Sequence, residues 1–513
     1  MAQSIKIIQN AIIVPCEPQA RLLRMDLLVK DDRIAEISNR GEIMKSLYPN
    51  AEVIDAAGKV LLPGFVDAHY HGESFVLKQF TQLFPLSRWS KEGSLRRILP
   101  YLYGEATKDE LVVAFRSAYF AALKSGVTTL GEYGFDNLDV PFQASFESLR
   151  RTDLRGLLAL HNGDQVERAK GGISPFIKFA VALPPEEDLT TYNLQSTLRI
   201  ARENNWPVVV HYGETQRAVE TIRRNFNKLP MEVLAEYRVF DYPVQLTHLS
   251  VLEGQELSLI AGTRLPLVVT PASILTKATD VPPLAAFFQY QIPLALGSDW
   301  GHSDPFENMR AFIALAASQR LDAASPSELL RMHTINAARS LGMDHEIGTL
   351  TVGKKADIAF VDIGDLRLAS LLANDRAEQF IADLVQHATS RDVSDVMING
   401  EFFLRKGQVM TYSEDDLKTE LSSLTVKLQN LLPSVKNSTE AQVTPITGSS
   451  SEMPSASLSD VEEGFRIVRR GIDQEHTPAT DAESTKVIPL NPEKPKEVEL
   501  PKTVRKVFGD DDF

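Results

Sequence analysis

The chain of 513 residues lacks most features of secreted, membrane-spanning and nucleic-acid-binding proteins. Its one cysteine, Cys16, excludes an internal disulfide and fits a reducing compartment. It has no run of about 18 apolar residues, so no membrane span is predicted. The N-terminus lacks the charged and apolar regions of a signal peptide. The formal net charge of -14 argues against nucleic acid as the main ligand. We therefore expect a cytoplasmic protein that acts on a small-molecule substrate.

Short β signals separated by polar turns occupy both flanks of a longer central region. They fill residues 1–62 and return over residues 346–412, where Asn399-Gly400 is a hairpin turn signal. The two flanks are therefore predicted to form one small β domain that the central region interrupts.

The central region, residues 63–345, alternates short apolar strands with longer helical stretches. Eight strands alternating with helices over this length are typical of a (β/α)8 TIM barrel, an α/β fold. The expected strands are 64–67, 128–132, 157–160, 177–183, 208–211, 244–247, 267–270 and 294–297. The expected helices include 108–125, 194–204, 231–237, 254–261 and 306–319.

The last hundred residues divide into a helix and a tail. Residues 413–433 carry leucines at helical spacing, which predicts a packed amphipathic helix. Residues 434–513 are rich in Ser, Thr, Pro, Glu and Lys and poor in aliphatic residues, so a disordered acidic tail is expected. Within it, residues 459–468 could form either a docking helix or a transient one.

Histidines and one aspartate follow the predicted barrel strands. His69 and His71 come directly after the first strand, and residues two apart on a strand point to the same side. His211, His248 and Asp299 each end another strand. Because barrel active sites are built at the carboxyl ends of the strands, these side chains are expected to converge. Imidazoles with one carboxylate suit Zn²⁺ or Fe²⁺.

Other side chains could complete such a site. Glu214, three residues after His211, can reach the same pocket without being a ligand and could move a proton between the attacking water and the substrate. His161, Trp300 and His302 are candidates for the substrate pocket, with core or loop packing as the alternative. Lys178 lies early in the fourth strand, too far from its end to bridge two metals.

This pattern resembles the amidohydrolase superfamily, and most closely its mononuclear-metal branch of cytosine, guanine and S-adenosylhomocysteine deaminases and s-triazine hydrolases. The resemblance covers roughly residues 5–410. Besides His248, its main segments are Pro63-Gly64-Phe65-Val66-Asp67-Ala68-His69-Tyr70-His71, Pro85-Leu86-Ser87-Arg88-Trp89, His211-Tyr212-Gly213-Glu214, Thr270-Pro271-Ala272-Ser273 and Leu296-Gly297-Ser298-Asp299.

The resemblance implies a distorted (β/α)8 barrel beside a small β-sandwich made from both flanks. It implies one divalent metal, Zn²⁺ or Fe²⁺, and suggests a homo-oligomer. The implied reaction is hydrolysis of a carbon–nitrogen bond other than a peptide bond, foremost deamination of a cyclic amidine or aminoheterocycle by metal-bound hydroxide. The implied roles are metal ligation by His69, His71, His211 and Asp299, proton shuttling by Glu214, contact with the hydrolytic water or substrate by His248, and acceptance of the water proton by Asp299.

One departure leaves the substrate open. Related deaminases carry a histidine after the fourth strand, and residues 181–187 have none, so purine or triazine specificity does not carry over. Hydrolysis of an amide, a cyclic urea or a chloro-heterocycle at the same metal site is an alternative. A catalytically silent scaffold that uses its tail as an interaction arm is another, although such a protein would be expected to lose its ligands.

Overall fold

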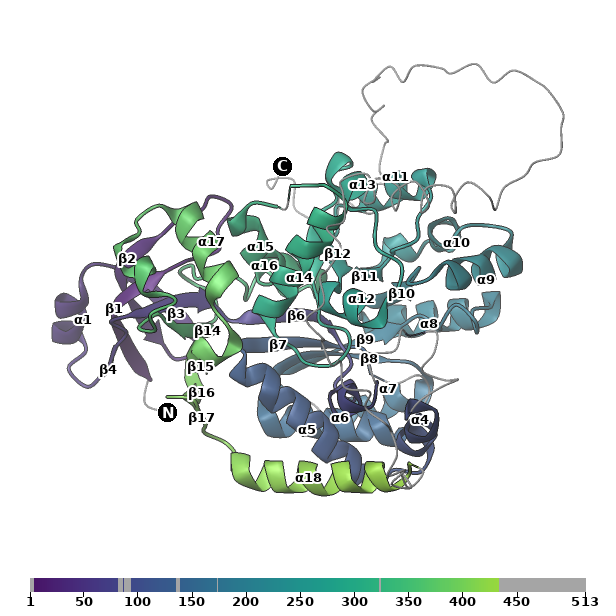
Figure 1. Ribbon diagram of the computed structural model, residues 1–513, viewed down its shortest axis with the longest axis horizontal. Coiled ribbons are helices and arrows are strands. Elements are labelled where there is room, and N and C mark those ends of the chain that lie inside the picture. Colours follow the sequence, from purple (N-terminus) through teal and green to yellow (C-terminus); the bar gives the residue numbers. More distant parts are fainter. Residues whose placement is uncertain are drawn as a thin grey trace, which may run out of the picture. The chain divides into compact units, whose positions relative to one another are not determined.

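The computed structural model describes residues 4–81, 86, 94–134, 139–172, 174–322 and 324–432. Its strands form two sheets, an eight-stranded parallel one and a nine-stranded mixed one (Figure 1). The predicted tail, with its candidate helix at residues 459–468, lies outside the described residues. So does most of the segment Pro85-Leu86-Ser87-Arg88-Trp89.

The parallel sheet is a nearly closed barrel whose strands pair in chain order. Its strands are β6 (Phe65–Tyr70), β7 (Val127–Glu132), β8 (Arg155–Leu160), β9 (Ile177–Ala182), β10 (Val208–Tyr212), β11 (Val244–His248), β12 (Leu267–Val269) and β13 (Leu294–Leu296). They are mostly buried because helices cover the outer face. The TIM-barrel prediction is confirmed, and all eight strands lie where the sequence predicts them.

The barrel closes between its first and last strands through the backbone of the candidate site. The Asp299 N–H donates to the His69 carbonyl at 2.7 Å, and the His71 N–H donates to the Asp299 carbonyl at 2.9 Å. A single parallel bridge pairs Tyr70 with Asp299. Barrel closure therefore fixes three of the predicted site residues against each other.

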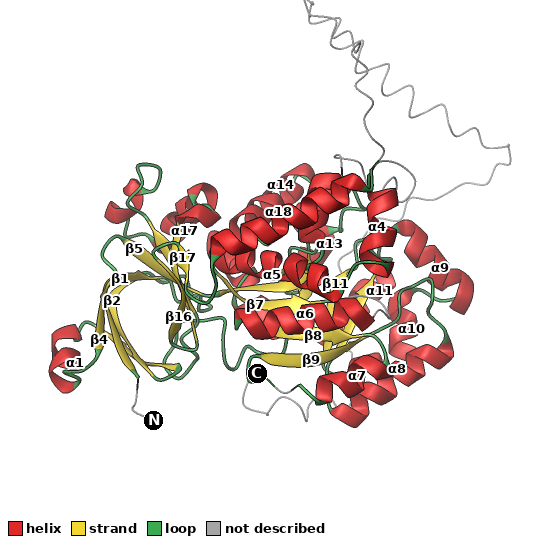
Figure 2. Ribbon diagram, turned by 90° about the horizontal axis from the view of Figure 1, so that it is seen from below, coloured by secondary structure: helices red, strands yellow, loops and turns green. Residues whose placement is uncertain are grey.

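Helices surround the barrel (Figures 1 and 2). Several begin at side-chain caps, such as Thr107, which forms a reciprocal capping box with Glu110 before α5. The barrel helices are α2 (Ser74–Leu77), α4 (Leu95–Gly104), α5 (Lys108–Lys124), α6 (Asp139–Thr152), α7 (Gly163–Lys170), α8 (Thr191–Asn204), α9 (Gln216–Phe226), α10 (Pro230–Glu236), α11 (Gly254–Thr263), α12 (Pro271–Lys277), α13 (Leu284–Gln289), α14 (Pro305–Ser318), α15 (Pro326–Met332) and α16 (Ile335–Ser340).

The mixed sheet draws on both flanks of the barrel segment, as the sequence predicts. Its central junction is the antiparallel pairing of β5 with β14, which joins the N-terminal strands to the C-terminal ones. The sheet curls around a core that includes Ile8, Leu27 and Phe360 (Figure 2). Its strands are β1 (Ile5–Ile13), β2 (Leu23–Lys30), β3 (Arg33–Ser38), β4 (Glu52–Asp55), β5 (Lys59–Pro63), β14 (Ile358–Asp362), β15 (Val393–Ile398), β16 (Glu401–Arg405) and β17 (Gln408–Val409), with helices α1 (Gly41–Leu47) and α17 (Ala377–His387) beside it.

The predicted C-terminal helix is present as α18 (Glu414–Asn430), which lies beside α5 (Figure 1). Ser413 caps its first turn, and Leu417, Leu424 and Leu428 are buried. Arg116 of α5 pairs with Glu420 of α18. The leucine stripe of α18 therefore packs against the rest of the protein, as the sequence predicts. The boundaries proposed for the parts of the chain, at residues 62, 345, 412 and 433, stay predictions.

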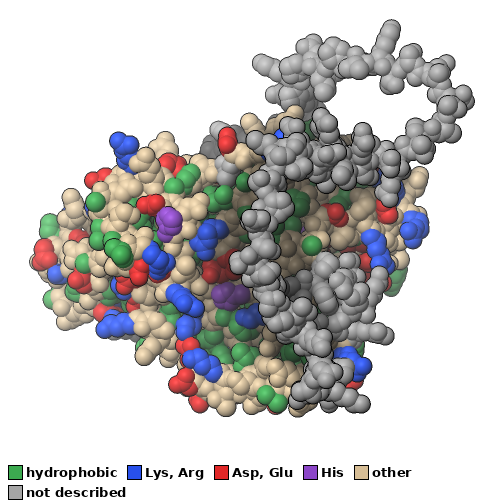
Figure 3. Space-filling model, in the orientation of Figure 1, with side chains coloured by type: hydrophobic (Ala, Val, Ile, Leu, Met, Phe, Trp, Pro, Cys, Tyr) green, Lys and Arg blue, Asp and Glu red, His purple; other side chains and the backbone are tan. Residues whose placement is uncertain are grey.

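Sequence-based expectations also concern the charges on the surface, the polarity of the helices and the single cysteine. Acidic and basic side chains intermingle on the described part of the face in Figure 3. None of the described helices is both long and apolar enough to span a bilayer. Cys16 is buried, and burial raises the pKa of its thiol to about 12, which leaves it protonated.

A buried ion pair connects the barrel to the mixed sheet. Arg155, the first residue of β8, contacts both carboxylate oxygens of Asp357 at 3.0 and 3.2 Å, and the side-chain exposures are 5% and 2%. Its guanidinium also donates to the Asn399 side chain at 2.7 Å. Because the pair is shielded from water, losing one partner would leave a charge without compensation.

We expect Arg155→Met to lower the free energy of unfolding by about 3–5 kcal/mol, because Asp357 would stay buried without its counter-ion. Urea denaturation measures the change. Arg405→Met is the matched control: Arg405 pairs with Glu52 at 2.7 Å, but the two side chains are 41% and 40% exposed. The control should cost less than about 1 kcal/mol. Equal effects of the two variants would contradict the prediction.

Candidate metal centre

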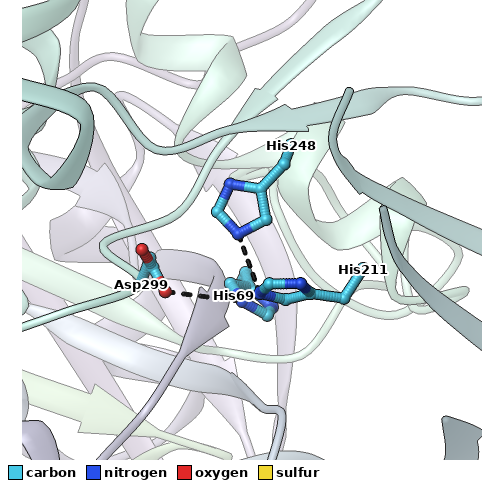
Figure 4. Close-up of side chains that lie close together, drawn as sticks. All are labelled: His69, His211, His248 and Asp299. Carbon is cyan, nitrogen blue, oxygen red and sulfur yellow. Dashed lines mark hydrogen bonds and ion pairs between the residues drawn. The ribbon is translucent and has the colours of Figure 1, made fainter. Parts of the chain in front are cut away.

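Four side chains from different strand ends converge on one point at the carboxyl end of the barrel (Figure 4). Three of them are buried, and His211 is half-buried. His69 belongs to β6, His211 to β10 and His248 to β11, and Asp299 follows β13. One ligand atom from each lies within 4.8 Å of the corresponding atom of every other member. The predicted convergence is therefore present in the fold.

The contacts within the cluster involve the atoms that would bind a metal. His69 Nε2 lies 3.7 Å from Asp299 Oδ1, and His211 Nε2 lies 2.9 Å from His248 Nε2. His71 Nε2 is 3.5 Å from the same Asp299 oxygen. His71 therefore borders the cluster. The group of four residues within 4.8 Å of one another contains His248 and not His71. The sequence analysis assigned His248 to contact with water or substrate.

The cluster fits a divalent cation. His69 Nε2 is buried and has no hydrogen-bond partner among the described residues. Burial lowers the pKa values of His69 and His211 well below the usual value, and neighbouring imidazoles lower them further. Neutral imidazoles beside an ionised carboxylate form the donor set that Zn²⁺ or Fe²⁺ prefers.

His71 has a different environment. Its Nδ1 lies 3.4 Å from the buried Glu73 carboxylate. Burial by itself lowers the pKa of His71, but Glu73 and Asp299 outweigh burial and raise it to about 9. Ligation by His71 would therefore release a proton, since a metal binds only the neutral ring.

A lysine absent from the predicted site lies at its centre. Lys277, the last residue of α12, places its ammonium 2.6 Å from Asp299 Oδ2 and 2.5 Å from Glu214 Oε1. Ser273 donates to the same Asp299 oxygen at 2.6 Å. Burial alone would raise the pKa of Asp299, but Lys277 and the imidazoles hold it well below its usual value.

Tyr133 packs against the histidines and was also missed by the sequence analysis. It directly follows β7, and its ring centroid lies 5.3 Å from those of His69 and His71 and 4.9 Å from that of His211. It also meets the His161 ring edge-on at 5.0 Å. A position directly after a barrel strand was the only sequence signal for Tyr133.

Two residues of the cluster have left-handed backbone conformations. His248 has φ 69° and Asp299 has φ 58°. Such conformations are costly for residues other than glycine, and they persist where the surrounding structure enforces them. For Asp299, the backbone bonds that close the barrel supply that constraint.

The predicted pocket residues have different surroundings. His161 Nε2 is bonded to the Tyr133 carbonyl at 2.9 Å. Trp300 directly follows Asp299, and the half-buried His302 ring lies 6.3 Å from that of Phe75. Their roles toward substrate stay predictions. The side chain of Lys178 is 47% exposed and lies 3.6 Å from Glu346. These surroundings agree with the sequence analysis, which rejected Lys178 as a bridge between two metals.

Comparison with known proteins identifies the family. The model of the Amidohydrolase family matches residues 60–403. The chain belongs to the amidohydrolase family. A 5-methylthioadenosine/S-adenosylhomocysteine deaminase of Moorella thermoacetica is 26% identical over 413 residues, which are 77% of this chain and 93% of the relative.

Solved structures with the same fold include two zinc-bound proteins. An adenosine deaminase from Xanthomonas campestris has a TM-score of 0.72 at 21% identity, covering 83% of this chain and 98% of that one. Atrazine chlorohydrolase from Arthrobacter aurescens has a TM-score of 0.70 at 18% identity, covering 82% and 100%. The predicted amidohydrolase resemblance, fold and hydrolytic enzyme class are confirmed.

Proposed function

We propose that this amidohydrolase deaminates an aminoheterocycle by hydrolysis at a mononuclear Zn²⁺ or Fe²⁺ centre. The observation that carries the proposal is the cluster of His69, His211, His248 and Asp299 beside the carboxylate of Glu214. Family membership and a relative named as a deaminase support it. The proposed ligands are His69, His71, His211 and Asp299, the set that the family resemblance implies. His71 borders the cluster through Asp299, and His248 is left to contact the water.

A divalent metal at these ligands would lower the pKa of a bound water and so supply the nucleophile near neutral pH. The chain's own residues would do the rest. His248 orients the attacking water through Nε2. Glu214 takes a proton from that water and delivers it to the ring nitrogen beside the attacked carbon. Asp299 accepts the second water proton, which leaves with ammonia.

The charge environment supports these roles for the carboxylates. Glu214 and Asp299 both contact the Lys277 ammonium, at 2.5 and 2.6 Å, so the two carboxylates lie close together. The side chain of Glu214 is 16% exposed, whereas that of Asp299 is 2% exposed. Glu214 is therefore the carboxylate with access to an entering substrate, which suits a group that exchanges protons with it.

Ammonia release from the full-length protein tests the proposal. The protein is reconstituted separately with zinc and iron, and its metal content is measured. It is then assayed with 5-methylthioadenosine, S-adenosylhomocysteine, other purines, pyrimidines, pterins, triazines and cyclic guanidines. We expect one metal per chain and ammonia from one of these substrate classes. Comparing the two metals assigns the cofactor.

The same assay separates the alternatives. Loss of substrate without ammonia would replace deamination by hydrolysis of an amide, a cyclic urea or a chloro-heterocycle at the same ligands. Failure to bind either metal would contradict the proposed centre. The cytoplasmic location and the homo-oligomer stay predictions, and light scattering of the purified protein tests the oligomer.

A further inference from the structure

Lys277 is a buried cation with two anionic partners, and the proposed reaction does not use it. Its side chain is 6% exposed, and its ammonium contacts both Glu214 and Asp299. A lysine side chain is ordinarily protonated near neutral pH, and two carboxylates within 2.6 Å stabilise its charge. Lys277 is therefore a fixed positive charge within the site.

The local sequence explains how Lys277 reaches this place. Ser273 and Lys277 are four residues apart on α12, so both side chains lie on the helix face that meets Asp299. The helix is itself held in place, because its Ala272 N–H donates to Asn308 at 3.4 Å and Asn308 donates to Ser298 at 2.8 Å. Ser298 is the neighbour of Asp299, so α12 and Asp299 share one anchor.

Each Asp299 oxygen has its own set of partners. Oδ1 lies 3.7 Å from His69 and 3.5 Å from His71, whereas Oδ2 accepts hydrogen bonds from Ser273 and Lys277. One oxygen is thus turned toward the imidazoles, and the other is held by α12. A rotation of this carboxylate would break the contacts on both sides.

We propose that Lys277 is a positioning residue whose ammonium fixes Glu214 and Asp299 in their working orientations and opposes metal binding by its charge. The inference rests on the proposed function, because it gives these two carboxylates roles in proton transfer. In the metal-free protein, Lys277 is the counter-ion of both carboxylates. When a dication binds through Asp299, two cations act on one carboxylate and repel each other. Lys277 therefore lowers metal affinity while it organises the proton-transfer groups.

Lys277→Met in the full-length protein tests the inference, because methionine keeps much of the length and removes the charge. We expect zinc to bind about tenfold more tightly in competition with a chelator, since nearby charges shift ionic equilibria by one to three logarithmic units. We expect kcat to fall at least about 100-fold, the usual contribution of a positioned proton-transfer group, while KM stays close to the wild-type value. The metal-free variant should have a lower melting temperature than the metal-free wild type. Zinc should raise the melting temperature of the variant by more than it raises that of the wild type.

Three further variants isolate the charge. Lys277→Ala leaves space for a small cation, so ethylammonium should restore part of its turnover and tetramethylammonium, which donates no hydrogen bond, should not. Ser273→Ala removes a neutral donor from the same Asp299 oxygen and should not tighten zinc binding. Lys6→Met is the control for losing a buried lysine elsewhere. The Lys6 side chain is 7% exposed and pairs with Glu401 at 2.7 Å in the mixed sheet, so this variant should keep wild-type zinc affinity and kcat.

The measurements distinguish failure of the inference from failure of the proposed function. Unchanged or weaker zinc binding in Lys277→Met would overturn the inference, and so would unchanged kcat. Loss of stability matching that of Lys6→Met, with no change in zinc affinity, would reduce Lys277 to a structural role. If Lys277→Met does not fold, absence of ethylammonium rescue in Lys277→Ala would decide against the inference. A wild type that releases no ammonia would overturn the proposed function, and the zinc measurement would still test Lys277.

Discussion

Glu214→Gln should stop turnover and leave the metal in place. Glutamine has the same shape and keeps a carbonyl oxygen beside the Lys277 ammonium, so the site should keep its geometry. It cannot carry a proton between water and substrate, so we expect kcat to fall about 10²- to 10⁴-fold. Ammonia release and metal content, measured on the same preparation, check both halves of this expectation.

The control for this variant is Glu187→Gln, which makes the same chemical change at an exposed glutamate after β9. It should leave both kcat and metal content unchanged. Substantial activity in Glu214→Gln would remove this residue from the mechanism. Loss of the metal in that variant would instead make Glu214 a ligand.

His211→Ala should lose the metal and, with it, the activity. The imidazole of His211 lies against those of His69 and His248, so its removal takes a nitrogen from the middle of the proposed ligands. Removing a partner outside the ligand set usually costs 10- to 100-fold in affinity, so loss of a ligand should cost more than about 100-fold. Metal content after dialysis and titration with zinc measure the change.

His161→Ala is the matched control, because His161 directly follows β8 of the same barrel but its ring is hydrogen-bonded to the Tyr133 carbonyl. It should keep the metal whatever it does to turnover. Wild-type zinc affinity in His211→Ala would contradict the ligand assignment. The melting temperature of the metal-free variant separates loss of a ligand from loss of the fold.

The sequence predicts the barrel and the meeting of the site residues because both depend on strand ends. His211 follows a short apolar run, and His248 follows a short segment in which apolar and polar residues alternate. Both patterns indicate strands, and in a parallel barrel all such strand ends lie on one rim. Asp299 required the same reasoning, although β13 is only three residues long. Periodicity in one dimension was therefore sufficient to place side chains that are far apart in the chain.

The sequence could not predict which faces of the helices turn toward the rim of the barrel. In the sequence, Lys277 has the pattern of an ordinary polar residue at a helix end. Only the packing of α12 shows that its side chain is buried and points toward the site. Glu132 ends a predicted strand, yet nothing in the sequence indicates that its carboxylate accepts from the Tyr119 hydroxyl and from the N–H of Gly72, the residue after His71. These contacts depend on three-dimensional distances that residue spacing does not encode.

The backbone closure through His69 and Asp299 also bears on how the protein folds. Closing the barrel joins its first and last strands, and contacts so distant in the chain form only after a large loss of chain entropy. We therefore expect the candidate ligands on β6 and after β13 to meet at a late step of folding. Until then, a nascent chain can bury its separate β/α units but has no complete site, so the appearance of metal affinity during refolding would report the moment at which the barrel closes.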